Sequence, residues 1–242
     1  MILAIDVGNT KIKVAVFEQD TMISKEDYTN ETLLEGLKKN YKKFPKCNKT
    51  IISSVSNVSE EVFLLLKSKG KLYFLTNDSK FPFENKYATP LTLGMDRKVI
   101  VSGAVLKFPK QNCLIIDAGS CITYDFVDEN KNYFGGAISP GIEMRYKALN
   151  NYTAKLPRLD TEEPDSYIGN STNQSIHSGV VNGVVYEIEG FINDYLRENK
   201  YLTIILTGGD ALFLAKRLKN PIFANSNFLL ESLNLLYQYN IQ

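Results

Sequence analysis

Several features that define particular protein classes are scarce or absent in this chain of 242 residues. It has no tryptophan, and its three cysteines, Cys47, Cys113 and Cys121, include no Cys-x-x-Cys pair. An odd number of scattered cysteines argues against a disulfide framework and against a zinc site. No apolar run approaches the roughly 18 residues that span a bilayer, and Asp6 interrupts the first apolar run too early for a signal peptide. We therefore expect a cytoplasmic protein that has no membrane partner.

A strong net charge is also lacking. The 28 Lys and Arg residues are balanced by 27 Asp and Glu residues, so no overall field of one sign recruits nucleic acid or an anionic surface. We expect no nucleic-acid partner. The hydrophobic share of 44% and the charged share of 23% are close to those of ordinary globular domains. The length therefore fits one large domain or two small ones.

A segment that occurs twice is the most informative feature that is present. Residues 3–17 predict a strand that ends in an acid, Asp6, then a tight turn at Gly8 and a returning strand with alternating apolar residues. Residues 114–127 repeat this plan, with Asp117 in the place of the acid. We therefore expect two halves, each of which opens with the same hairpin.

Elements of both kinds follow each hairpin, as in an α/β fold. Apolar periodicity and capping residues predict helices at 33–44, 60–69, 96–108, after Gly141, at 172–199, through Leu214 and Leu218, and at 228–239, and strands at 50–55, 72–75, 133–138 and 202–206. No low-complexity linker separates the halves, so we expect them to pack closely around a cleft.

The first hairpin has residue types that suit a phosphate group. An apolar strand brings Asp6 to the Gly8 turn, and the returning strand brings back Lys13. Glycine allows the backbone amides to approach a phosphate, an ammonium group neutralises it, and a carboxylate can hold Mg²⁺. The alternative is a hairpin whose Asp-x-Gly only forms the turn. The second copy favours the phosphate interpretation, because Asp6 and Asp117 at matching hairpin ends suit a cation and a polyphosphate.

Two further segments each allow two interpretations. Asp96 and Arg97 stand where an irregular stretch meets a helix; they can be a general base and an anion-binding group, or a plain helix start. The segment 207–211, Thr-Gly-Gly-Asp-Ala, follows a strand and opens a helix. It can allow a nucleotide's base and ribose to approach the backbone, or it can be an ordinary turn capped by Asp210.

Taken together and in order, these segments resemble the type III pantothenate kinases, a family in the superfamily of acetate and sugar kinases, actin and related ATPases. The resemblance covers nearly the whole chain and rests on Asp6-Val7-Gly8-Asn9-Thr10 with Lys13, Tyr87 followed by Pro90 and Gly94-Met95-Asp96-Arg97, Ile116-Asp117-Ala118-Gly119, the segment 135–141, and Thr207-Gly208-Gly209-Asp210-Ala211. It implies two similar ribonuclease H-like, actin-like ATPase halves with a nucleotide cleft between them. Residues 1–112 would carry the phosphate loop and the substrate segment, and residues 113–242 the second phosphate hairpin and the nucleotide and dimer contacts.

The same resemblance implies an activity. It is the ATP-dependent phosphorylation of pantothenate to 4'-phosphopantothenate, the first step of coenzyme A biosynthesis, by a homodimer that uses Mg²⁺ and a monovalent cation, K⁺ or NH₄⁺. Asp96 would be the proton acceptor and Asp117 the ligand of the monovalent cation. The residues implied to bind ATP are Asp6, Val7, Gly8, Asn9, Thr10, Lys11, Ile12, Lys13 and Ser120. Those implied to bind pantothenate are Tyr87, Gly94, Met95, Asp96, Arg97 and Thr172.

Two other functions remain open at this point. One is a kinase of the same superfamily that acts on a sugar or a short-chain acid, because a fold does not determine a substrate. The segment 94–97 argues against it. The other is a nucleotide-binding regulator without catalytic activity, against which the presence of Asp96 argues.

Overall fold

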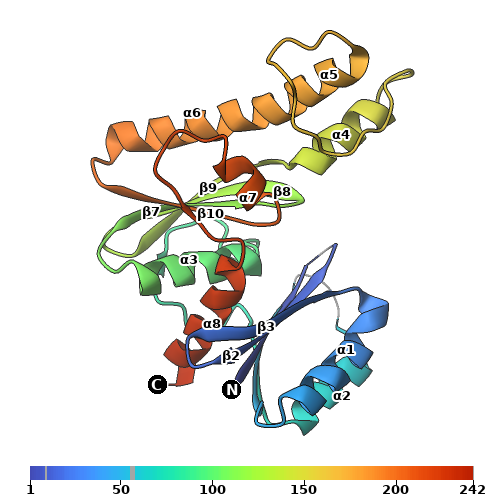
Figure 1. Ribbon diagram of the computed structural model, residues 1–242. Coiled ribbons are helices and arrows are strands. Elements are labelled where there is room, and N and C mark those ends of the chain that lie inside the picture. The colour runs from blue at the N-terminus through green and yellow to red at the C-terminus, as the bar shows by residue number, and fades with distance from the viewer. Residues whose placement is uncertain (9, 55–57, 242) are drawn as a thin grey trace. The chain divides into compact units, whose positions relative to one another are not determined.

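The computed structural model describes residues 1–8, 10–54 and 58–241 (Figure 1). These residues form a mixed α/β fold with two sheets, which confirms the predicted fold class. The chain divides into two compact units. The first consists of Met1–Pro109, Lys131–Tyr133 and Asn227–Gln242, and the second of Lys110–Asn130 and Phe134–Ser226. No helix in the described ranges is long and apolar enough to cross a membrane.

The sheet of the first unit has the order β3-β2-β1-β4-β5. Its strands are β1 (Ile2–Val7), β2 (Ile12–Glu18), β3 (Thr21–Tyr28), β4 (Lys49–Ser54) and β5 (Lys71–Phe74). β1 lies in the centre, antiparallel to β2 and parallel to β4. The predicted first hairpin is therefore confirmed, and its acid-bearing strand has a neighbour on each side.

Two layers of helices cover this sheet. The helices are α1 (Asn30–Lys43), α2 (Glu60–Ser68), α3 (Met95–Lys107) and α8 (Phe228–Ile241). α1 and α2 pack on one face, and α3 and α8 on the other (Figure 1). Ser59 caps α2, since its side chain accepts a hydrogen bond from the backbone N–H of Val62.

Alternation along β1 decides which groups this sheet presents to each layer. Leu3, Ile5 and Val7 belong to the core formed with α1 and α2. Asp6 therefore projects from the opposite face, on which α3 and α8 pack. The same strand thus builds a hydrophobic core on one side and offers a carboxylate on the other.

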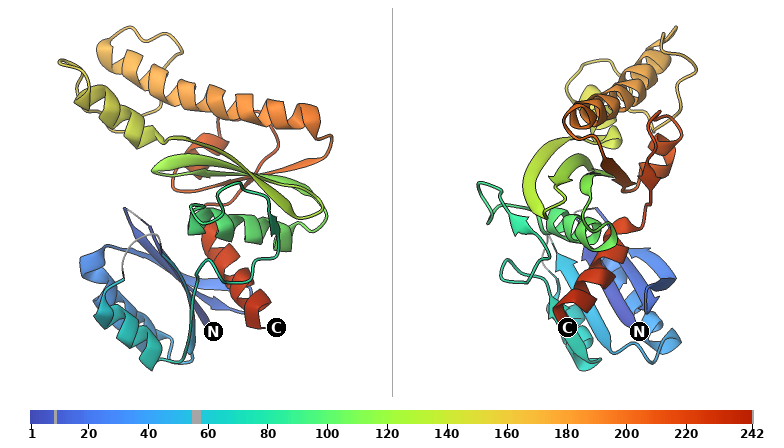
Figure 2. Two further views of the ribbon diagram at one scale, coloured as in Figure 1. Left: turned by 180° about the vertical axis from the view of Figure 1, so that it is seen from behind. Right: turned by 90° about the vertical axis from the view of Figure 1, so that its left-hand side faces the viewer.

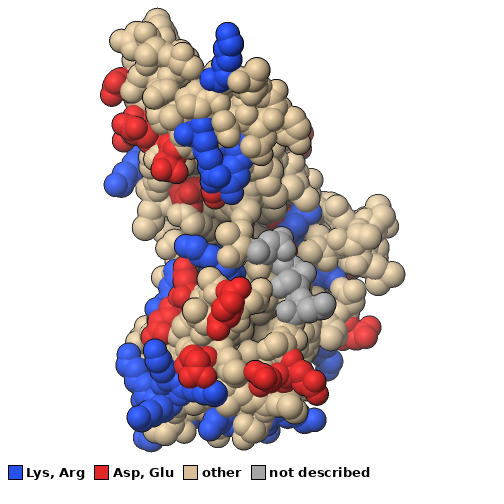
Figure 3. Space-filling view, turned by 90° about the vertical axis from the view of Figure 1, so that its right-hand side faces the viewer, with Lys and Arg blue, Asp and Glu red and all other residues tan. Residues whose placement is uncertain are grey.

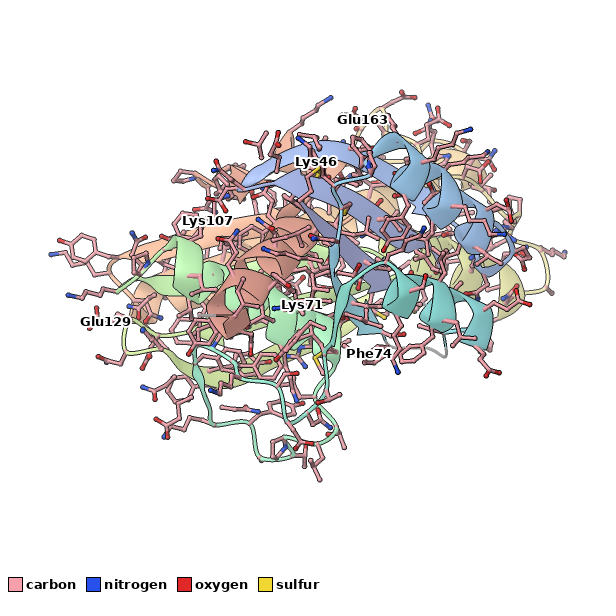
Figure 4. All side chains as sticks on the ribbon, turned by 90° about the horizontal axis from the view of Figure 1, so that it is seen from below. Lys46, Lys71, Phe74, Lys107, Glu129 and Glu163 are labelled. Atoms are coloured by element: carbon pink, nitrogen blue, oxygen red, sulfur yellow. The ribbon has the colours of Figure 1, made fainter. Side chains whose placement is uncertain are left out.

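The last helix corrects the predicted division of the chain. Residues 113–242 were expected to form one half, but α8 belongs to the first unit. Gly103 of α3 allows a close approach to α8, because a Cβ atom there would lie 1.8 Å from Ser232 Oγ. Lys107, labelled in Figure 4 at the end of α3, donates to Glu231 of α8 at 2.8 Å. α8 packs in the first unit by burying its apolar side chains against α3 and the first sheet.

The sheet of the second unit has the order β11-β10-β7-β8-β9. Its strands are β7 (Asn112–Ala118), β8 (Cys121–Val127), β9 (Asn132–Pro140), β10 (Leu202–Thr207) and β11 (Phe223–Ala224). β7 is antiparallel to β8 and parallel to β10, so the second predicted hairpin is confirmed. The short strand β6 (Glu84–Asn85) pairs with Asn132 and Tyr133, the β9 residues that belong to the first unit.

Helices cover one face of the second sheet (Figure 2). They are α4 (Ile142–Asn151), α5 (Thr172–His177), the π-helix η1 (Ser178–Asn182), α6 (Gly183–Glu198) and α7 (Ala211–Ala215). α5, η1 and α6 follow one another directly, so the predicted helical stretch 172–199 is confirmed. The helix expected through Leu214 and Leu218 contains only the first of these residues, because α7 ends at Ala215.

Candidate functional site

Asp6 lies at the end of β1 with a basic and a hydroxyl residue in register beside it. It is 7% exposed. Its register partners are Lys13 on the antiparallel strand β2 and Ser53 on the parallel strand β4. Registered residues project from the same face of a sheet. Ser53 Oγ is buried and has no hydrogen-bond partner in the part of the chain that the structure describes, so this strand end offers a carboxylate, an ammonium group and a hydroxyl to a polar ligand.

The turn after Asp6 is tight and open to a ligand. The Gly8 amide donates to the Lys11 carbonyl oxygen at 3.2 Å, and a Cβ atom on Gly8 would lie 3.1 Å from that oxygen. A hollow of about 190 Å³ beside the turn is lined by Gly8, Thr10, Lys11, Ile12 and residues 28–31. Val7 and Ile12 bury their side chains in the core, so only their backbone groups can face a ligand. Asn9, also expected here, lies outside the described residues.

Asp117 repeats this layout in the second unit. It lies near the end of β7, with Thr123 on the antiparallel neighbour β8 and Thr207 on the parallel neighbour β10 as register partners. The Oγ1 atoms of Thr123 and Thr207 are buried and have no hydrogen-bond partner among the described residues. The duplication seen in the sequence therefore extends to strand pairing: each acid has a polar side chain in register on both of its neighbouring strands.

The glycine turn after β10 lies against Asp117. Gly208 has φ +97°, a conformation that favours glycine. A Cβ atom on Gly208 would lie 2.2 Å from the Ala118 carbonyl oxygen and 2.5 Å from Asp117 Oδ1. The Asp210 amide also donates to the Ala118 carbonyl oxygen, at 3.0 Å. A side chain on residue 208 would therefore displace the carboxylate of Asp117.

Ser120 lies in the β7–β8 turn and is exposed. Its carbonyl oxygen accepts a hydrogen bond from the Gly141 amide at 3.1 Å. A Cβ atom on Gly141 would lie 2.1 Å from the Gly119 carbonyl oxygen. Gly141 precedes α4, so the start of that helix supports the turn that carries Ser120.

A second hollow lies beside Asp210. It has a volume of about 220 Å³ and is lined by Glu143, Tyr146, Lys147, Arg158, Leu159, Asp160, Thr161 and Asp210. Burial raises the pKa of the Asp210 carboxyl above its ordinary value, and the nearby Glu143 carboxylate raises it further. The hollow therefore contains acidic and basic side chains, together with the Asp210 carboxyl, whose ionisation is disfavoured by burial.

The segment 94–97 forms the start of α3. Asp96 Oδ1 accepts a hydrogen bond from the Arg97 amide at 2.8 Å, and the positive end of the helix dipole favours a carboxylate here. Arg97 is only 5% exposed, and its guanidinium carbon lies 5.6 Å from the centre of the Tyr87 ring. A Cβ atom on Gly94 would lie 2.4 Å from Asp96 Oδ1. The structure thus brings together Tyr87, Gly94, Asp96 and Arg97.

The remaining predicted substrate residues take separate positions. Met95 is the first residue of α3 and is half-buried. Thr172 is the first residue of α5, directly after Ser171, whose side chain accepts from the Gln174 amide at 3.2 Å. Thr172 is exposed and belongs to the second unit, whereas Met95 and the other predicted substrate residues belong to the first.

Sequence reasoning missed several polar residues near these groups. Ser53 and Thr123 were not singled out, although each stands in a strand that pairs with an acid-bearing one. Lys98, next to Arg97, is 4% exposed. The signal that could have found the hydroxyl residues is the strand register, which follows once the β1–β4 and β7–β8 pairings are known. No three His, Cys, Asp or Glu side chains cluster as metal ligands within the described ranges.

Comparisons with known proteins place these features in a family context. The family model described as type III pantothenate kinase matches residues 2–194. A type III pantothenate kinase from Flavobacterium johnsoniae is 57% identical over 241 residues, covering 100% of this chain and 99% of the relative. A solved Campylobacter jejuni protein named for the Baf family of transcriptional activators has a TM-score of 0.66 at 21% identity, covering 99% of this chain and 98% of that one. A glucokinase from an Antarctic psychrotroph has a TM-score of 0.54 at 11% identity, covering 98% of each chain. At these low identities the two structures support the fold alone.

Proposed function

The chain belongs to the type III pantothenate kinase family, and on this premise we propose that it transfers the γ-phosphoryl group of ATP to the primary hydroxyl of pantothenate. The product is 4'-phosphopantothenate, the first intermediate on the route to coenzyme A. The full-length similarity to curated pantothenate kinases carries this proposal. The clustering of Tyr87, Gly94, Asp96 and Arg97 at one helix start supports it, because these residues suit an acceptor that has both a hydroxyl and a carboxylate.

Asp96 is the proposed general base. As the acceptor oxygen bonds to the γ-phosphorus atom, Asp96 takes the hydroxyl proton. The bond between the γ-phosphorus and the bridging oxygen breaks, and ADP leaves with that electron pair. Arg97 supplies a positive charge for the pantothenate carboxylate, and Tyr87 holds the guanidinium by a cation–π contact.

Residues 6–13 are the proposed phosphate loop. The backbone amides of the Gly8 turn, the Thr10 hydroxyl and the Lys13 ammonium group contact phosphate oxygens in this proposal. Asp6 suits Mg²⁺, because a buried carboxylate with the Ser53 hydroxyl in register offers the hard oxygen donors that this ion prefers. When bound, the ion neutralises charge on the triphosphate.

Asp117 is the proposed ligand of a monovalent cation, K⁺ or NH₄⁺. The buried hydroxyl oxygens of Thr123 and Thr207 fit such an ion, because they stand in register with Asp117 and lack hydrogen-bond partners among the described residues. Ser120 contacts ATP in the same proposal. The base and ribose suit the hollow beside Asp210. The preceding Gly209 is exposed, and a Cβ atom there would meet nothing within 4 Å, so its backbone is open to a ligand.

The proposed oligomeric state is a homodimer, and the proposed location is the cytoplasm. Exposed apolar side chains of the second unit support self-association, among them Ile138, which is 62% exposed, and Tyr186, which is 63% exposed. Acidic and basic side chains both occur on the face drawn in Figure 3, in keeping with the near-zero net charge. Light scattering after size exclusion should give about twice the chain mass of 27.3 kDa. A mass of one chain at all concentrations would reject the dimer.

A substrate panel tests the function. Purified protein with Mg²⁺-ATP is assayed for ADP release on pantothenate, several hexoses and acetate, first in K⁺ and then with Na⁺ as the only monovalent cation. We expect turnover of pantothenate alone, and faster turnover in K⁺. Hexose or acetate turnover without pantothenate turnover would assign the chain to another kinase class. ATP binding without any turnover would favour the regulator.

A further inference from the structure

Lys98 is a buried lysine beside the proposed acceptor site. It is 4% exposed, and burial lowers the pKa of its ammonium group. Its Nζ donates to Asn77 Oδ1 at 2.7 Å and lies 5.6 Å from the centre of the Phe81 ring. No carboxylate pairs with it in the described part of the chain. Among the described residues, the ammonium group is thus held by the Asn77 amide oxygen and the face of the Phe81 ring.

This position is energetically unfavourable for a cation. Burying an ammonium group without a counter-ion costs free energy. The first turn of a helix also carries the positive end of the dipole, which disfavours a cation, and Lys98 lies in the first turn of α3. An apolar side chain of similar length would fill the same space without these costs. A role in packing alone therefore does not account for a lysine here.

The partners of Lys98 belong to the segment 76–93, which contains no regular structure except β6. The segment leaves the sheet after Phe74, which is labelled in Figure 4. Asn77 stands in a turn in which the Ser79 amide donates to the Thr76 carbonyl oxygen at 3.1 Å. Lys98 therefore fastens the first part of the segment to α3.

The later part of the segment carries Tyr87. The Tyr87 ring stacks on Tyr133, with ring centres 6.3 Å apart, and lies over Arg97. Two consecutive residues of α3 thus hold the segment at two points: Lys98 holds Asn77 and Phe81, and Arg97 contacts Tyr87. All of these residues belong to the first unit.

We propose that Lys98 is a positioning residue for the acceptor site, which fastens the segment 76–93 so that Tyr87 stays over Arg97 in the geometry that binds an anionic acceptor. The proposal rests on the proposed function, because it assigns the acceptor site to Tyr87 and Arg97. Lys98 itself does not contact the substrate in this account. Its loss should weaken acceptor binding and leave the ATP site unchanged.

The kinetic test compares Lys98→Met with Asn77→Ala, which removes the other partner of the same hydrogen bond. Both should raise KM for pantothenate about fivefold to tenfold, with little change in KM for ATP, a loss expected when a hydrogen bond to a charged group is removed. The double variant should be no worse than Lys98→Met alone, because both remove one interaction. Lys98→Arg should recover part of the affinity. Lys86→Met is the control, since Lys86 lies in the same segment but is exposed and pairs with Glu84.

Two kinetic outcomes overturn the proposal. One is an unchanged KM for pantothenate in Lys98→Met. The other is a parallel loss of kcat, affinity for ATP and melting temperature, which indicates a general structural role. We expect the melting temperature of Lys98→Met to be equal to or above that of the parent protein, because the variant no longer buries a charge.

Hydrogen exchange separates this proposal from the proposed function. Amides of residues 76–93 should exchange faster in Lys98→Met than in the parent, and those of the β1–β2 hairpin should not change. If the parent protein does not phosphorylate pantothenate, the proposed function fails, and the exchange measurement still decides whether Lys98 fastens the segment. Unchanged exchange in 76–93 overturns the positioning role whatever the activity.

Discussion

Gly94 controls the position of a carboxylate although it has no side chain. Its φ of −56° is one that any residue can adopt, so the backbone does not require glycine. The requirement is steric, because a Cβ atom would lie 2.4 Å from Asp96 Oδ1. Asp96 would have to turn away from its hydrogen bond with the Arg97 amide. Gly94, two residues before the proposed base, therefore leaves the space that the Asp96 carboxylate occupies.

Gly94→Ala should lower kcat for pantothenate about tenfold or more, since misplacing a catalytic group by about 1 Å can cost two orders of magnitude. The melting temperature should change little. Gly190→Ala in α6 is the matched control, because a Cβ atom there meets nothing within 4 Å. It should keep kcat and stabilise the helix by about 0.5–1 kcal/mol. A parental kcat in Gly94→Ala would show that the carboxylate position does not limit turnover.

Single residues were predictable here where a turn or a helix start marks them. Asp6, Gly8 and Asp96 all stand at such boundaries in the printed sequence. Ser53 and Thr207 became neighbours of the two acids only through the pairing of β4 with β1 and of β10 with β7. That pairing joins segments far apart in the chain, and local periodicity carries no information about it.

At the scale of elements, one carboxylate fastens α6 to three other elements. Glu187 of α6 accepts hydrogen bonds from Tyr124 of β8 at 2.8 Å, from Arg145 of α4 at 2.5 Å, and from Ser139 of β9. Burial alone raises the pKa of Glu187, but the hydrogen bonds from Arg145, Ser139 and Tyr124 outweigh burial, and the pKa lies below its ordinary value. The ionised form is therefore the one that the folded state prefers.

This preference predicts a pH dependence. A carboxyl whose pKa is lower in the folded state adds stability above its unfolded pKa, here 4.5, and loses it as the pH falls through the folded pKa. Glu187→Gln should therefore be less stable than the parent by about 1–3 kcal/mol at pH 7. The difference should shrink as the pH is lowered below 4.5. Urea unfolding at several pH values measures it, and a difference that does not depend on pH would contradict the account.

Element prediction succeeded where the apolar pattern was strong. The helical stretch 172–199 and the hairpin strands have continuous or alternating apolar residues, and the structure confirms them. β3 was missed because it is mostly exposed and rich in polar residues, so it lacks an apolar stripe. α7 was predicted too long. Leu218 is an apolar residue at helical spacing that packs against the core, but it lies beyond the end of the helix at Ala215.

At the scale of the whole molecule, the C-terminal helix shows the limit of sequence reasoning. The pattern of residues 228–239 predicts a buried helix but not the core that it enters. The division at residues 112 and 113 follows the repeated hairpins, whereas α8 packs on α3 and on the first sheet. The close approach of Gly103 in α3 to Ser232 in α8 is a fit that appears only in three dimensions.

The duplicated hairpin nonetheless places one acidic residue in each unit in equivalent strand surroundings. Each unit supplies one acid with polar side chains in register on both sides, and the first unit adds a carboxylate at the start of α3. In the proposed function, the hairpin acids Asp6 and Asp117 hold cations, and the Asp96 carboxylate accepts the proton of the acceptor hydroxyl. These roles are separable, because a substitution of Asp96 should leave ATP binding intact.

The turnover number of Asp96→Asn with pantothenate and Mg²⁺-ATP tests this claim most directly, with ATP binding measured on the same preparation. Asparagine keeps the shape of the side chain but cannot accept the proton. We predict a kcat lower by about 10² or more, as expected for loss of a general base, together with ATP binding like that of the parent. Equal turnover numbers for the variant and the parent would contradict the account.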